Sequence, residues 1–450
     1  MKPLLSGRHS ATPVVDSIAP TVRSLLGREL PFRLRGWDGS ETGPADSPVT
    51  VVIHSPLALR YLLWAPGELG LARAHVAGEL DIEGDIFKLL NARDLLVDEV
   101  SEPYELRFNP KSLGALAKSA FNVGAIGPPP PRPIEEAKPR GLRHSIGRDA
   151  ASVSHHYDVG NDFYRIVLGP SWTYSCGYWP TGDMTLEQAQ ASKYELVSRK
   201  LGLREGMRLL DVGCGWGGMV IHAALHHGVR AVGVTISKEQ QQKARERVEE
   251  LGLGDRVEIR LQDYREIHDG PFDAISSIGM FEHVGEERMK EYLSDLRDLL
   301  RPGGRLLNHA ISRPDPSRRS SIRPRSFVGR YVFPDGALVE VGRVVSTMQG
   351  LGLEVRDLQS LREHYARTLR AWVANLESQW DEAQRLAGPG RARVWRLYMA
   401  GSALGFEDNR ISVHQVLAVR TPPDGKSDVE PNRSLLDVPQ PVDLGLPSGS

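Results

Sequence analysis

The sequence predicts an α/β protein with a Rossmann-like, doubly wound sheet and a smaller N-terminal α+β domain. Three observations favour this class. The chain has 450 residues, more than one hydrophobic core usually organises. Beyond residue 150, short apolar runs alternate with amphipathic stretches, the β-α-β order that builds a parallel sheet. A glycine-dense turn at 213–218 follows the first of these runs and precedes a helical stretch.

The strands of the larger domain are predicted from their apolar runs. After Glu286 a helix is expected up to Leu300, and the glycines that follow Pro302 should end it. In a sheet of this kind, ligands bind at the carboxyl ends of the strands. The predicted strands are Arg208–Cys214, Ala231–Ser237, Val257–Leu261, Phe272–Ile278 and Arg305–Ile311.

The N-terminal region predicts a small mixed domain, residues 1–126. FRLRGWDG and PVTVVIHS are expected to be two strands of a hairpin, joined by ETGPADS. From Pro56 to about Val100, apolar residues recur at helical spacing in three pieces. A proline-rich linker (127–148), the larger domain (149–422) and a disordered tail rich in Pro, Ser, Asp and Gly (423–450) are expected to follow.

The composition excludes some function classes. Lys and Arg number 56 against 57 Asp and Glu, so no overall field for nucleic acid is expected. No metal site is predicted. The two cysteines, Cys176 and Cys214, suggest a reduced intracellular protein. The first residues lack the apolar core of a signal peptide, and no run of about 18 apolar residues could span a membrane.

The glycine turn is the strongest local indication of a ligand. Glycines let the backbone turn sharply and let a ligand approach it closely, and Gly213, Gly215 and Gly217 are the candidates for that approach. Such a turn serves either a dinucleotide or S-adenosylmethionine (AdoMet). Asp211, just before the glycines, favours AdoMet because a carboxylate there can hold its amino acid end.

The second predicted strand favours AdoMet as well. It ends in Thr235-Ile236-Ser237 and lacks the acidic residue that usually grips the ribose of NAD. Gln240, one helical turn further on, is expected to supply the ribose contact. Thr235 and Gln240 are also ordinary residues at a helix start, and that alternative stays open.

Several further motifs follow one another in the sequence. Together with the glycine turn they are HYDVGND (156–162), YSCGYW (174–179), GVTIS (233–237), QDY (262–264), GMFEHVG (279–285) and YVFPD (331–335). This set closely resembles cyclopropane-fatty-acyl-phospholipid synthases and the related mycolic acid methyltransferases. The resemblance covers about residues 150–420 and implies the fold of a class I AdoMet methyltransferase. The N-terminal region also resembles the extra domain of the phospholipid-acting members.

The resemblance implies a role for each matching residue. The larger domain would be the catalytic domain, and AdoMet would be bound by two sets of residues besides Asp211. Tyr174, Ser175, Gly213 and Gly215 would contact its amino acid part, and Thr235, Ile236, Gln240, Tyr264 and Ile278 its ribose and adenine. A bicarbonate ion would be held by Cys176, Glu282, His309, Ile311 and Tyr365.

The implied reaction transfers a one-carbon unit to the cis double bond of an acyl chain in a membrane phospholipid. An alkene is a weak nucleophile, so the enzyme must align it with the methyl group, exclude water and supply a base. Bicarbonate would be that base and would deprotonate a carbocation. The product would be a cyclopropane or a methylene group, which a separate reductase could turn into a methyl branch.

Aromatic residues of the motifs are candidates to stabilise the cation. Tyr174, Tyr178, Trp179 and Phe281 belong to this group, although core packing is the better interpretation for any one of them. Cys176 as a small buried residue and Glu282 as a helix-start carboxylate are alternatives to catalytic roles. His283 is expected to be structural.

Three other functions remain open. A methyltransferase for a small-molecule acceptor explains the glycine turn but leaves Glu282 and His309 without a purpose. A lipid-binding or AdoMet-sensing protein needs no base. A NAD oxidoreductase is disfavoured by Thr235.

The expected location is the cytoplasm, at the inner face of the membrane. Self-association is left open. The arginine-rich segment Arg313–Arg330 holds one acidic residue, Asp315, and is the candidate for docking on an anionic surface, with a solvated loop as the alternative.

Overall fold

The computed structural model describes residues 12–26, 28–94, 110–137, 159–315, 322–323, 326–334 and 336–429. The chain divides into two compact units. The N-terminal unit comprises Met1–Glu136, Arg325–Phe327 and Pro389–Leu397. The large unit comprises Ala137–Pro324, Val328–Gly388 and Tyr398–Ser450.

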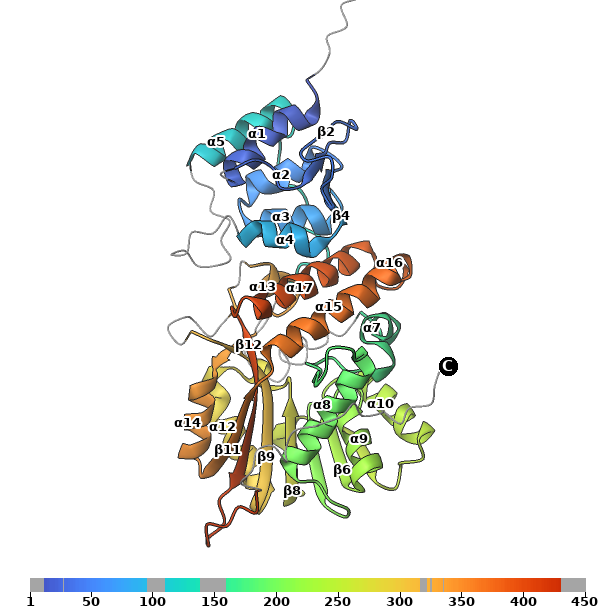
Figure 1. Ribbon diagram of the computed structural model, residues 1–450, viewed down its shortest axis with the longest axis vertical. Coiled ribbons are helices and arrows are strands. Elements are labelled where there is room, and N and C mark those ends of the chain that lie inside the picture. The colour runs from blue at the N-terminus through green and yellow to red at the C-terminus, as the bar shows by residue number, and fades with distance from the viewer. Residues whose placement is uncertain are drawn as a thin grey trace, which may run out of the picture. The chain divides into compact units, whose positions relative to one another are not determined.

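An eight-stranded sheet organises the large unit (Figure 1). From β9 to β7 neighbouring strands run parallel, whereas β12 is antiparallel to both β9 and β11. The order is β11 (Leu353–Ser360), β12 (Ser412–Arg420), β9 (Leu300–Arg313), β8 (Phe272–Ile278), β5 (Arg208–Val212), β6 (Arg230–Thr235) and β7 (Val257–Leu261), and β10 (Val339–Glu340) pairs with β9.

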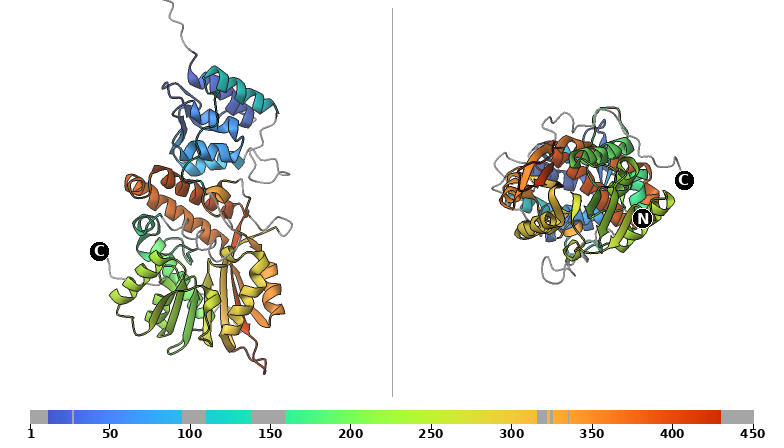
Figure 2. Two further views of the ribbon diagram at one scale, coloured as in Figure 1. Left: turned by 180° about the vertical axis from the view of Figure 1, so that it is seen from behind. Right: turned by 90° about the horizontal axis from the view of Figure 1, so that it is seen from below.

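Helices cover both faces of this sheet, as Figures 1 and 2 show. Alternate strand residues enter different cores because side chains on a strand point to opposite faces. Leu209 packs in one core with α8 (Leu186–Leu201), α9 (Gly218–His227) and α10 (Lys238–Glu250). Leu210 packs in the other core with α11 (Phe281–Val284), α12 (Met289–Leu299) and α14 (Val341–Gly350). The predicted doubly wound fold is therefore confirmed.

The large unit contains further helices besides those of the two cores. They are α7 (Asn161–Leu168), α15 (Arg362–Ser378) and α16 (Trp380–Ala387), and α13 (Phe327–Tyr331) and α17 (Pro389–Glu407) belong to it in part.

One predicted boundary in the large unit is wrong. The helix ends at Leu299, before the proline and glycines that were expected to stop it, and Leu300 already begins β9. Leu300 has an extended backbone, with φ −85° and ψ 145°, and pairs with Phe272 of β8. A register shift between Phe272 and Ala274 of β8 lets the strand accommodate Pro302 and the glycines after it.

The N-terminal unit contains a four-stranded sheet, in the order β2 (Glu41–Thr42), β1 (Arg33–Arg35), β3 (Val49–Ile53) and β4 (Leu80–Gly84). The predicted hairpin is wrong, because β1 and β3 pair in parallel. The expected connection itself contains β2, which turns back antiparallel on β1 and takes the place of a hairpin partner. The helices are α1 (Val14–Leu26), α2 (Leu57–Trp64), α3 (Glu68–Val76), α4 (Ile86–Asp94) and α5 (Pro110–Asn122).

The described part of the proline-rich segment lies against the N-terminal unit. The Tyr61 hydroxyl donates to the carbonyl of Pro131 at 2.6 Å, and Arg73 forms a 2.8 Å ion pair with Glu136. Residues 138–148 of the predicted linker and 430–450 of the predicted tail lie outside the described residues, whereas Val429 is buried. The domain boundaries given above stay predictions.

The predicted docking segment is described only in part. Arg318, Arg319 and Arg325 lie outside the described residues. Arg313 is the last residue of β9 and is only 7% exposed, so this arginine is not available to a membrane surface. Among the described helices, none is both long and apolar enough to cross a membrane.

Candidate active site

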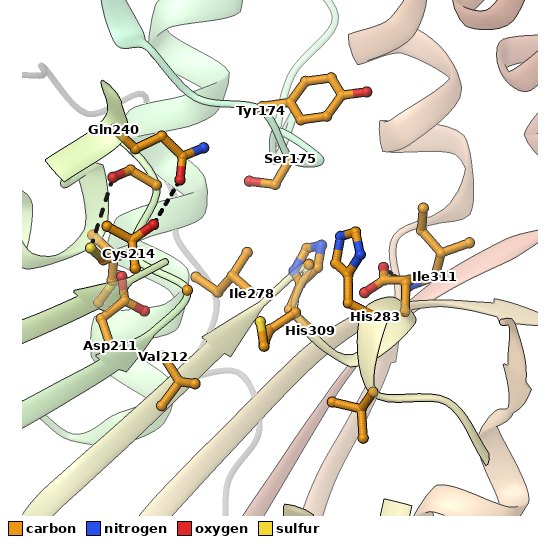
Figure 3. Close-up of a pocket in the computed structure, with 18 of the residues that line it drawn as sticks. Tyr174, Ser175, Asp211, Val212, Cys214, Gln240, Ile278, His283, His309 and Ile311 are labelled. Carbon is orange, nitrogen blue, oxygen red and sulfur yellow. Dashed lines mark hydrogen bonds between the residues drawn. The ribbon is translucent and has the colours of Figure 1, made fainter. Parts of the chain in front are cut away.

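A cavity of about 200 Å³ opens in the large unit where β5, β6, β8 and β9 end. All of the site residues predicted from the sequence line it. Figure 3 shows Asp211, Cys214 and Gln240 on one side of this pocket, and His309 and Ile311 on the other. The structure therefore brings the two predicted groups of residues together, although their roles stay predictions.

The glycine turn forms one wall of the cavity. Gly213 and Gly215 have φ angles of 78° and 55°, in the left-handed region that favours glycine. The amides of Gly213 and Cys214 both donate to the carbonyl of Val234, which fixes the turn against β6. A Cβ atom at Gly215 would meet no other atom within 4 Å, so the turn leaves open space there for a ligand.

The end of β6 supplies the polar groups predicted to meet the ribose. The Thr235 hydroxyl donates to Oε1 of Gln240 at 2.9 Å, and both side chains are buried. Ser237 caps α10 through the amide of Gln240. Tyr264 lies on the short helix η2 (Tyr264–Glu266), and burial is the main reason that its pKa rises to about 12.

Asp211 is a buried carboxylate near the end of β5. The Ser276 hydroxyl donates to its Oδ1 at 2.6 Å. Burial raises the pKa of Asp211 to about 6, while the positive charge of Lys193 opposes that rise. Asp211 thus stays mostly ionised at neutral pH and can bind a cationic group.

Lys193, on α8, was not predicted from the sequence. Its Nζ donates to Oγ of Ser175 at 3.0 Å, and the side chain is 1% exposed. Burial lowers the pKa of Lys193 to about 7, against the charge of Asp211. Lys193 lies four residues after Ala189 and four before Val197, on the buried stripe of α8, and that spacing is the feature that could have revealed it.

Aromatic side chains form part of the wall. The ring of Tyr174 stacks on Trp372 at 5.2 Å between centroids, and Tyr365 packs edge-on against the same indole at 6.0 Å. Of the aromatic residues considered as cation stabilisers, Tyr174 lines the cavity, whereas Tyr178, Trp179 and Phe281 are buried outside its lining.

Cys176 is fully buried and behaves as a thiol. Its Sγ donates to the carbonyl of Gly177 at 3.1 Å, and burial raises its pKa well above the ordinary value. A nucleophilic role would need the thiolate, which this environment disfavours.

Glu282 presents one carboxylate oxygen to the protein and leaves the other without a described partner. Its Oε1 accepts the amide hydrogen of Ile311 at 2.7 Å, whereas its buried Oε2 has no hydrogen bond among the described residues. Burial raises the pKa of Glu282 to about 7. A carboxyl group with this pKa can gain or lose a proton near neutral pH.

His309 lies on β9, opposite Ile278 of β8 and Gln415 of β12. The Gln415 side-chain nitrogen faces Nδ1 of His309 at 3.2 Å, which assigns the hydrogen of the neutral ring to Nε2. Burial lowers the pKa of His309 to about 3, so the ring is neutral. Its buried Nε2 has no described partner and can donate to a ligand.

His283 also lines the cavity, although the sequence suggested a structural role. Its ring packs on Phe333 at 6.0 Å, and burial lowers its pKa to about 4. Apolar side chains also form part of the wall, namely Ile311, Ile322, Leu338 and Val413. Ile311 is paired with Val413 across β9 and β12, and its amide contacts Glu282.

Comparisons with known proteins agree on one family. Residues 144–416 match the family model described as mycolic acid cyclopropane synthetase. The chain is 44% identical over 437 residues to a probable fatty acid methyltransferase of Mycobacterium tuberculosis, an alignment that covers 94% of this chain and 97% of the relative. It is 37% identical over 265 residues to the cyclopropane-fatty-acyl-phospholipid synthase of Escherichia coli K12, covering 59% and 66%.

A solved structure shares the fold of the large unit. It is mycolic acid cyclopropane synthase CmaA1, crystallised with SAH and CTAB. The TM-score is 0.57 at 35% identity, and the match covers 60% of this chain and 98% of that one.

Proposed function

The chain belongs to the mycolic acid cyclopropane synthetase family, and from that premise we propose that it transfers a one-carbon unit to the double bond of an unsaturated phospholipid acyl chain. It is an AdoMet-dependent methyltransferase with the class I fold. The substrate class, the base and the product are the parts of this proposal that go beyond the family.

The glycine-turn side of the cavity fits AdoMet. The open space at Gly215 lets the cofactor approach the backbone, and the carboxylate of Asp211 suits its ammonium group. The hydroxyl of Ser175 and the pair of Thr235 and Gln240 offer hydrogen bonds along the same wall. AdoMet bound there supplies a methyl group on a positively charged sulfur.

The apolar wall beside Glu282 and His309 carries the substrate assignment. A polar acceptor would leave its hydrogen-bonding groups unpaired against Ile311, Ile322, Leu338 and Val413, at a cost in free energy. A hydrocarbon chain has no hydrogen-bonding groups to leave unpaired there, and it excludes water from the reacting atoms. This observation favours an acyl chain over a small polar molecule.

Glu282 and His309 fit a bound bicarbonate ion. Each has a buried polar atom without a described partner in this one cavity, Oε2 of Glu282 and Nε2 of His309. As the carboxylate, Glu282 would accept the hydroxyl hydrogen of the anion, and the neutral ring of His309 would donate to it from Nε2. Tyr365, which also lines the cavity, can add its hydroxyl, and the Ile311 amide keeps Glu282 in place.

These residues would control the proton that the substrate must lose. By accepting the hydroxyl hydrogen at Oε2, Glu282 would make the anion a better proton acceptor. If the proton leaves the added carbon directly, a cyclopropane ring results. If a hydride shift comes first, the product is a methylene group that a separate reductase would convert to a methyl branch.

Isotopic labelling tests this proposal. The full chain is incubated with AdoMet labelled in its methyl group and with vesicles of an unsaturated phosphatidylglycerol, with a saturated one as the control. Label in the unsaturated lipid alone is expected, and NMR would distinguish ring from methylene hydrogens. Label that appears only in small water-soluble acceptors would instead establish the alternative, a small-molecule methyltransferase.

A further inference from the structure

The most exposed large apolar side chains of the described residues all belong to the N-terminal unit. Ile134 is 92% exposed, Phe121 is 76% exposed, and Trp64 and Ile126 are each 56% exposed. In the described part of the large unit, no large apolar residue exceeds 41%. We call Trp64, Phe121 and Ile126 the N-terminal patch.

The segments that carry the N-terminal patch are held together by hydrogen bonds. Trp64, at the end of α2, donates from its indole nitrogen to the carbonyl of Gly127 at 3.0 Å. Arg60, one turn earlier on α2, donates to the carbonyl of Ala125 at 2.9 Å. The amide of Ala125 donates in turn to Ala120 near the end of α5. Trp64, Phe121 and Ile126 therefore lie at the loop of residues 123–127, which these hydrogen bonds hold in place.

The packing of α5 fixes which side chains face outward. Leu116 and Ala120 are buried, and the Ser119 hydroxyl meets that of Thr21 of α1 at 2.7 Å. Phe121 follows these buried residues on the opposite side of the helix. Its exposure therefore follows from a defined orientation of α5.

The segment of residues 110–134, which carries Phe121 and Ile126, is basic. Residues 110–134 contain Lys111, Lys118 and Arg132 and no Asp or Glu. All three cations are exposed, and none forms an ion pair within the part of the chain that the structure describes. Exposed aromatic and aliphatic side chains among unpaired cations are the combination that binds an anionic lipid surface.

Resting on the phospholipid substrate proposed above, we infer that the N-terminal patch docks the enzyme on anionic phospholipid membranes. Phe121, Trp64 and Ile126 insert among the lipid head groups, and Lys111, Lys118 and Arg132 attract the surface. The N-terminal patch is thus proposed as the membrane-docking surface in place of Arg313–Arg330, the segment suggested from the sequence.

Vesicle co-sedimentation of the full chain tests this inference. Phe121→Ser with Ile126→Ser should weaken binding to phosphatidylglycerol-containing vesicles by about tenfold or more, since apolar contact is lost. The matched control, Leu225→Ser with Leu358→Ser, changes two exposed leucines of the large unit and should bind as the wild type does. Changing Lys111, Lys118 and Arg132 to Gln should weaken binding most at low salt.

Two further measurements make the result decisive. AdoMet affinity by calorimetry should be unchanged in the Phe121/Ile126 variant, and turnover should fall on vesicles but persist on detergent-dispersed lipid. Vesicle binding equal to that of the wild type overturns the inference, as does an equal loss in the leucine control.

The docking surface and the proposed function can fail separately. If the wild type modifies no lipid but still binds vesicles through these residues, the docking surface stands and the proposed function fails. If light scattering shows that the variant loses a dimer and vesicle binding stays the same, the N-terminal patch is a contact between copies.

Discussion

The carboxylate of Glu282 on α11 accepts a 2.7 Å hydrogen bond from the backbone amide of Ile311 on β9. Because the donor is the main chain, no side-chain change at Ile311 removes this contact. The bond holds Oε1 and leaves the buried Oε2 for a ligand. His309 lies two residues earlier on the same strand, so β9 positions both members of the proposed base site.

Replacing Glu282 with Gln should reduce turnover by about 100-fold or more, because an amide cannot draw a proton from the bound anion. The pKa of Glu282 is raised to about 7 by burial, so the wild-type rate should rise with pH as the carboxylate forms. The variant should lack that rise. Rates measured from pH 6 to 8 at saturating AdoMet would contradict this if both proteins gave the same profile.

Replacing His309 with Ala should cause a similar loss of turnover, since Nε2 is proposed to hold the anion. AdoMet affinity, measured by calorimetry, should change little. His414 offers a matched control on the neighbouring strand β12, because its Nδ1 meets Ser312 and it does not line the cavity. Near-native activity in His309→Ala would remove this residue from the base site.

Replacing Gly215 with Val should abolish AdoMet binding. The φ of 55° strains any branched residue, and the side chain would enter the space that the cofactor needs. Gly252, with a φ of 66° and open surroundings away from the cavity, provides a control with similar backbone strain. If both Val variants fold and only the one at 215 loses affinity, the loop assignment holds; equal affinities would refute it.

The sequence predicted the strands of the sheet from local patterns, whereas the residues that line the cavity followed mainly from the resemblance to a known family. Apolar runs between helical stretches predicted β7 and β8 with their observed bounds. The sequence did not predict the parallel pairing of β1 with β3, because local patterns do not determine which distant segments pair. Lys193 was missed for a related reason: its partner Ser175 lies before α8, so the role of the lysine depends on tertiary structure.

Replacing Lys193 with Met should weaken AdoMet binding by roughly tenfold, since a buried charged donor to Ser175 is lost.

The pH dependence of AdoMet binding separates this role of Lys193 from a structural one. Asp211 has a pKa of about 6, which the charge of Lys193 holds down against burial. Wild-type affinity should therefore fall as the pH drops through about 6, because a protonated Asp211 no longer attracts the cofactor's ammonium group. Without Lys193 that fall should begin at a higher pH. Lys200→Met removes another buried lysine of α8, which pairs with Asp357 at 2.9 Å, and should leave the profile in place. Calorimetry from pH 5.5 to 8 showing the same midpoint in Lys193→Met and wild type would exclude the proposed coupling to Asp211.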